Sequence, residues 1–129
     1  MNMKKIFSSA LLVILFSVAA VAQNAAYSLY KFNSTAESDI VLKALNLEVK
    51  FSDAEFTRMQ EILTASARSQ SELFKLPDNK NPENIAMIVN RQTTHIEGNL
   101  KNLIGEDRYK KYLAAKATIE AKAKELGKN

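Results

Sequence analysis

The chain has 129 residues, contains no cysteine and carries a formal net charge of +4 at neutral pH. Without cysteine it has no disulfide, thiol nucleophile, iron–sulfur cluster or thiolate zinc site, so its stability depends on packing alone. Basic and acidic residues alternate along the sequence, which is not the concentrated positive charge typical of a nucleic-acid-binding protein.

Residues 1–22 have the layout of a secretory signal peptide. Lys4 and Lys5 precede an apolar run over residues 6–18, and Ala20-Val21-Ala22 is a small-x-small cleavage site. The apolar run is shorter than the roughly 20 residues that a membrane-spanning helix needs. We therefore predict cleavage of this segment and a periplasmic or secreted location, with no stable membrane insertion afterwards.

The processed chain would begin near Gln23 and carry sixteen basic against fourteen acidic residues. Residues 23–35 show no sustained hydrophobic periodicity. Their larger side chains lie among asparagine and serine residues: Tyr27, Leu29, Tyr30 and Phe32. We expect a mobile or loosely docked N-terminal arm here, followed by a single helical domain over residues 36–129.

The helical domain is predicted to be all-α, because glycine and proline are scarce and mostly lie where a helical period starts or stops. A short helix is expected from about Ala36 to Leu47. Ser52 marks the next helix start, since its hydroxyl and the Glu55 carboxylate can form a capping box, and Phe51 and Phe56 can close a hydrophobic staple.

Turn-forming residues at 76–81 end that helix, and Asn81 followed by Pro82 predicts the start of a third helix. This helix should end near Ile104, where Gly105 is free to adopt a left-handed conformation. Gly98 lies inside it, so either a neighbour approaches closely at Gly98 or the helix is simply weakened there.

The last helix is expected to open with Glu106 and Asp107 and to stop at Gly127. Its predicted inward face consists of Tyr109, Tyr112, Leu113, Ile119 and Leu126. The expected fold therefore has one short and three longer helices.

No motif indicates an enzyme. His95 is the single histidine, and no sequence motif places a nucleophile or an orienting carboxylate beside it. It is either a plain residue at the margin of the apolar face or a ligand or proton-sensing group. The sequence also lacks a phosphate-binding glycine loop, a metalloprotease motif and a calcium loop. We predict no catalytic residue, no cofactor site and no metal site.

Two helix starts resemble each other. Each places an apolar residue, a cap position and an acid ahead of an amphipathic helix: Phe51-Ser52-Asp53-Ala54-Glu55 and Ile104-Gly105-Glu106-Asp107-Arg108. This arrangement resembles the paired L-T-x-x-Q signatures of the Spy/CpxP family of small exported helical proteins. The leucine, threonine and glutamine of the signature correspond to Phe51, Ser52 and Glu55 in the first motif and to Ile104, Gly105 and Arg108 in the second.

The resemblance implies a fold and a function. Members of the family include ATP-independent chaperones and envelope-stress proteins. Their protomer has one short and three longer helices in an antiparallel hairpin or cradle, and two protomers form a dimer whose concave face holds client chains. It implies that this chain is an exported binding protein and a homodimer. The mixed charge and the predicted export argue separately against a nucleic-acid partner.

Flexible and amphipathic side chains could furnish the contacts to such a polypeptide: Met59, Phe74, Met87, Tyr109 and Tyr112. The alternative for each is an ordinary core position. The alternative for the whole protein is a dedicated structural or regulatory interaction protein without general chaperone activity.

Overall fold

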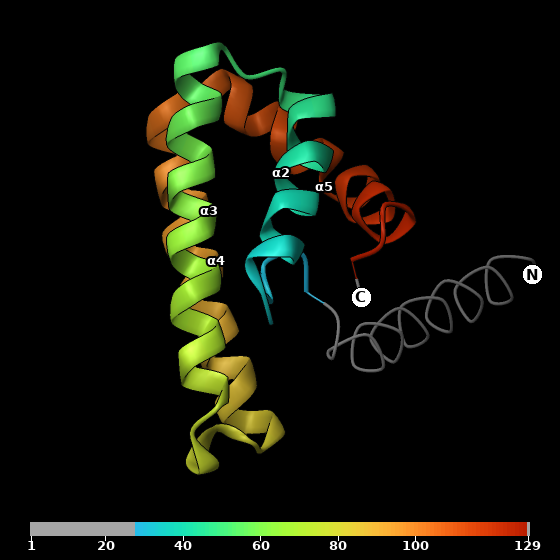
Figure 1. Cartoon of the computed structure of the whole chain (residues 1–129). Coiled ribbons are helices and arrows are strands. Elements are labelled where there is room, and N and C mark those ends of the chain that lie inside the picture. Colours follow the sequence, from blue (N-terminus) through green and yellow to red (C-terminus); the bar gives the residue numbers. More distant parts are fainter. Residues whose placement is uncertain (1–27, 129) are drawn as a thin grey trace, which may run out of the picture.

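The computed structural model describes residues 28–128, in which every regular element is a helix and there is no strand. Figure 1 shows the helices, which are α2 (Thr35–Val49), α3 (Asp53–Phe74), α4 (Pro82–Ile104) and α5 (Glu106–Glu125), with a 3-10 turn, η2 (Pro77–Asn79), between α3 and α4. The prediction of an all-α fold with one shorter and three longer helices is confirmed. The predicted signal peptide lies outside the described residues.

The longest helices, α3 and α4, lie side by side and run in opposite directions, because the short connection through η2 returns the chain at once (Figure 1). Helix α2 packs between α3 and α5, and α5 also packs against α4. The core lies around α2, whose Val41, Ala44 and Leu45 are fully buried. The end of the α3–α4 pair that carries η2 extends beyond α2 (Figure 1).

The predicted start of α3 is confirmed in atomic detail. Ser52 Oγ accepts a hydrogen bond from Glu55 N at 3.2 Å, and Glu55 Oε1 accepts one from Ser52 N at 3.0 Å. These two bonds satisfy backbone donors that the first helical turn leaves unpaired. Phe51 and Phe56 are partly buried and pack against the core.

Replacing Ser52 with alanine is expected to lower the free energy of unfolding by about 1 kcal/mol, because the Glu55 amide loses its acceptor. Urea denaturation followed by circular dichroism measures this loss. Ser69→Ala, at an exposed position in the middle of α3, is the matched control and should change stability little. Equal midpoints for Ser52→Ala and the native protein would contradict the role of the cap.

The ends of α4 also follow the sequence. Asn81 Oδ1 accepts a hydrogen bond from Asn84 N at 2.8 Å, and Pro82 occupies the first helical position. Gly105 separates α4 from α5 and has a φ of 86°, a conformation that side-chain-bearing residues rarely adopt. The positive φ agrees with the predicted left-handed conformation, but the ψ of 166° lies outside the left-handed helical region.

Gly98 is not a site of close approach. A Cβ atom added there would meet nothing within 4 Å, so the glycine only weakens α4. We expect Gly98→Ala to raise the free energy of unfolding by about 1 kcal/mol, the difference in helix propensity. Thermal and urea denaturation measure the gain. Gly105→Ala should instead destabilise the protein because of its positive φ, and a loss of stability in Gly98→Ala would contradict the open surroundings.

The predicted inward face of α5 is partly wrong. Leu113 is 49% exposed and Leu126 is 42% exposed. The buried positions are Tyr112, Ile119 and Ala123, spaced by seven and four residues along one narrow stripe. Leu113 is turned about 100° from Tyr112 and points away, since an α-helix has 3.6 residues per turn. Leu126 lies beyond the end of the helix.

The N-terminal arm also differs from expectation over the residues that the structure describes. Leu29, Tyr30 and Phe32 are at most 1% exposed and belong to the main core. The expectation of a mobile or loosely docked arm is therefore corrected for residues 29–32, which we call the strap. Three large apolar side chains bury enough surface to outweigh the entropy cost of ordering this short segment.

Candidate polypeptide-binding surface

The two motif-derived helix starts meet in the structure. The guanidinium of Arg108, in the first turn of α5, forms two parallel hydrogen bonds with the Glu55 carboxylate in the first turn of α3. The Nη1–Oε2 and Nη2–Oε1 distances are 2.8 and 3.0 Å. Only 19% of the Glu55 side chain is exposed. Such two-pronged pairs are stronger and more directional than single ion pairs.

Arg108 also connects this pair to the end of α2. Its Nη2 donates to the carbonyl oxygens of Val49 and Lys50 at 3.3 and 3.4 Å. The pKa of the Glu55 carboxyl is held below its ordinary value. The hydrogen bonds from Arg108 contribute most to this shift, and the hydrogen bond from Ser52 N contributes next. The motif positions therefore join three helix ends at one point, a structural role that the sequence argument did not foresee.

The other motif residues support the same junction. Phe51 is partly buried against the core, and Ile104 is 7% exposed. Gly105 provides the sharp change of direction between α4 and α5. The acidic and basic residues at equivalent places in the two motifs, Glu55 and Arg108, were the signal in the sequence that could have indicated the pair.

The residues proposed to touch a polypeptide fall into three groups. Met59 and Tyr112 are at most 1% exposed and cannot reach a partner in this fold, so their assignment is corrected. Tyr109 is partly buried and lies beside the ring of Tyr112, with centroids 5.4 Å apart. Phe74 is partly exposed, and Met87 is 47% exposed. These last two remain available.

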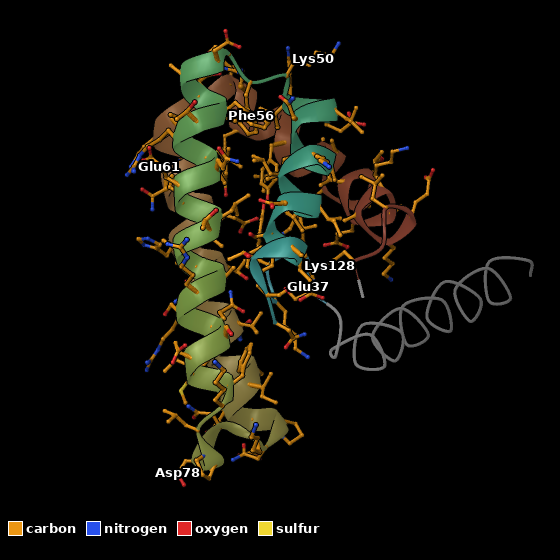
Figure 2. The ribbon with its side chains drawn as sticks, viewed as in Figure 1. Glu37, Lys50, Phe56, Glu61, Asp78 and Lys128 are labelled. Carbon is orange, nitrogen blue, oxygen red and sulfur yellow. The ribbon has the colours of Figure 1, made fainter. Side chains whose placement is uncertain are left out.

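Phe74 and Met87 lie at the η2 end of the α3–α4 pair, which we define as residues 73–88. Leu76 is 51% exposed there, and Leu73, Ile85 and Ile88 are partly exposed. Figure 2 shows Asp78 at the far end of this region, well away from Glu37 of α2. The surface is apolar in part and also carries exposed charges of both signs: Lys75, Lys80, Asp78 and Glu83.

Two shallow grooves lie outside residues 73–88. One, of about 580 Å³, lies between α3 and α4, and most of the residues that line it are polar, including Arg58, Arg91 and His95. The other, of about 240 Å³, lies between α2 and α5 and includes Lys111. His95 is exposed, and its Nε2 lies 3.3 Å from Asn99 Nδ2.

Within residues 28–128 no group of three or more histidine and acidic side chains is arranged to hold a metal ion. No helix in that part of the chain is long and apolar enough to cross a membrane.

A buried polar network lies where the strap meets α5. Tyr30 Oη lies 2.8 Å from Tyr112 Oη, which donates to Glu97 Oε2 at 2.6 Å, and Lys116 Nζ contacts the same carboxylate oxygen at 2.8 Å. Burial raises the pKa of both tyrosine hydroxyls above the ordinary value of 10.0, so both stay protonated at neutral pH. The network is a set of hydrogen bonds that joins the strap to α4 and α5.

Comparison with protein-family models, with curated proteins and with solved structures finds no match for this chain.

Proposed function

We propose that this chain is an exported, non-enzymatic helical protein that holds unfolded or partner polypeptides, as the resemblance to the Spy/CpxP family implies. The observation that carries the proposal is the exposed apolar surface at the η2 end of the α3–α4 pair. Leu76 and Met87 are about half exposed there, beyond the cover of α2. Exposed methionine and leucine side chains suit binding to varied apolar segments.

The proposal includes a homodimer, in which two protomers would together form the concave face that holds client chains. Light scattering on the processed chain measures its mass in solution. The expected result is twice the protomer mass, and a monomer at all concentrations would remove the dimeric cradle from the proposal.

Aggregation assays with several unrelated denatured proteins test the holding activity. The native protein should suppress aggregation at near-stoichiometric amounts, and the double variant Leu76→Ser, Met87→Ser should require several-fold more protein. Leu113→Ser is the matched control, because Leu113 is equally exposed but lies on α5. Failure of the native protein on every client, together with one tight partner in a pulldown, would favour the dedicated regulatory protein instead.

A further inference from the structure

The strap is held by side chains of the helical body, in the way that a protein holds a bound peptide. The Gln70 amide, fully buried on α3, accepts a hydrogen bond from Phe32 N at 2.9 Å and donates one to the Tyr30 carbonyl oxygen at 2.8 Å. The strap's own backbone hydrogen bond is local, from Lys31 N to Ser28 O at 3.2 Å. A pair of bonds to main-chain groups recognises a peptide without regard to its sequence.

Sequence preference would come from the side chains that the site encloses. Leu29, Tyr30 and Phe32 are at most 1% exposed, whereas Lys31 between them is partly exposed. The Tyr30 hydroxyl forms a hydrogen bond with the Tyr112 hydroxyl at 2.8 Å, which favours tyrosine at this position. The site therefore fits a segment with the pattern Leu-Tyr-x-Phe.

Two side chains in the wall of the site keep a polar partner without the strap: Ser66 Oγ donates to Gln92 Oε1 at 2.7 Å, and Tyr112 Oη donates to Glu97. Gln70 keeps the bond from its Nε2 to Ser66 Oγ at 3.0 Å, and detachment of the strap frees its Oε1 and its other amide hydrogen for another peptide. Lys128, near the C-terminus, also contacts the strap. Its ammonium lies 6.0 Å from the Phe32 ring centroid and 3.5 Å from the Ser28 carbonyl oxygen. Figure 2 shows Lys128 and Glu37 near the start of α2, where the strap joins the helix.

From this arrangement we propose that the strap site is a polypeptide-binding site, occupied in cis by residues 29–32, and that it takes a Leu-Tyr-x-Phe segment of another chain when the strap leaves. The strap is then autoinhibitory. This inference rests on the proposed function and gives it a second, regulated site. A competing ligand binds only the open form. Its apparent Kd therefore equals the Kd for the open form divided by the fraction of protein in which the strap is detached.

Peptide binding to the processed chain tests the proposal. The probe is a labelled peptide with the sequence Ser-Leu-Tyr-Lys-Phe-Asn, which copies residues 28–33, and fluorescence anisotropy measures its affinity. Phe32→Ala weakens the strap and leaves its site intact, so it should bind the peptide about tenfold or more tightly than the native chain does. Phe56→Ala, which removes a partly buried ring outside the strap, is the matched control and should not gain affinity.

Hydrogen exchange on the native chain provides a measurement that does not depend on a variant folding. The amide of Phe32 should exchange at least tenfold faster than those in the middle of α3, because the strap opens without global unfolding. Exchange of Phe32 only through global unfolding would overturn the proposal. Dimers of Phe32→Ala that exchange straps, without peptide binding, would overturn it too, since the occupant would then be a second copy.

The two proposals fail in different ways. Client holding by the native chain with no peptide binding to Phe32→Ala would overturn the strap site and leave the proposed function standing. Peptide binding that strengthens in Phe32→Ala, without client holding by any variant, would support the strap site and contradict the holding function.

Discussion

Replacing Gln70 with leucine is expected to lower the free energy of unfolding by about 2–4 kcal/mol, the largest change in stability that we predict. The substitution leaves the Phe32 N–H and the Tyr30 carbonyl buried without their partner. Each unsatisfied buried group costs about 1–3 kcal/mol, whereas the added apolar surface of leucine offsets part of that loss.

Urea denaturation of the processed chain measures this change. Gln60→Leu makes the same chemical change at an exposed position of α3 and should shift stability by less than about 0.5 kcal/mol. If Gln70→Leu unfolds at the native urea concentration, the strap is not held by the Gln70 amide.

Breaking the Arg108–Glu55 pair should lower the free energy of unfolding by about 1–2 kcal/mol, because hydrogen bonds to charged groups are stronger than neutral ones. Arg108→Gln and Glu55→Gln remove one charge each, and both place the glutamine of the L-T-x-x-Q signature at these positions. Glu55→Gln keeps an oxygen that can accept from Ser52 N. The double variant should be more stable than the sum of the two losses predicts, by about 1 kcal/mol.

The same pair sets a dependence on pH. The pKa of Glu55 is lowered from its ordinary value of 4.5 in the folded protein, mainly by the hydrogen bonds from Arg108. The folded state therefore gains stability from the ionised carboxylate above the unfolded pKa and loses it as the pH falls through the folded pKa. Native protein should lose more stability than Glu55→Gln on acidification below about 4.5, and equal losses would contradict the pair.

The sequence allowed the helix ends to be predicted because their causes are local. Ser52 with Glu55, Asn81 with Pro82, and Gly105 each satisfy or break backbone hydrogen bonds within a few residues. Their chemistry is therefore visible in a short window of sequence. The scarcity of glycine and proline indicated the all-α fold for the same reason.

Long-range pairings were not predictable from such windows. Gln70 is a single polar residue on α3, and no short window of sequence connects it with Phe32, 38 residues away, whose amide it binds. Leu113 and Tyr112 are adjacent apolar residues, and only the packing of α5 decides which one is buried. The Glu55–Arg108 pair, 53 residues apart, depends on how three helices meet.

The connection between α4 and α5 consists of Gly105 alone, so the rotation of α5 about its axis is tied to that of α4. Inserting one helical residue at the start of α5 would turn the rest of that helix by about 100° relative to the joint. Arg108 would then swing away from Glu55, and Tyr112 would leave the core for solvent. The length of this link is thus as strictly constrained as any interior side chain, although Gly105 itself lies at the surface.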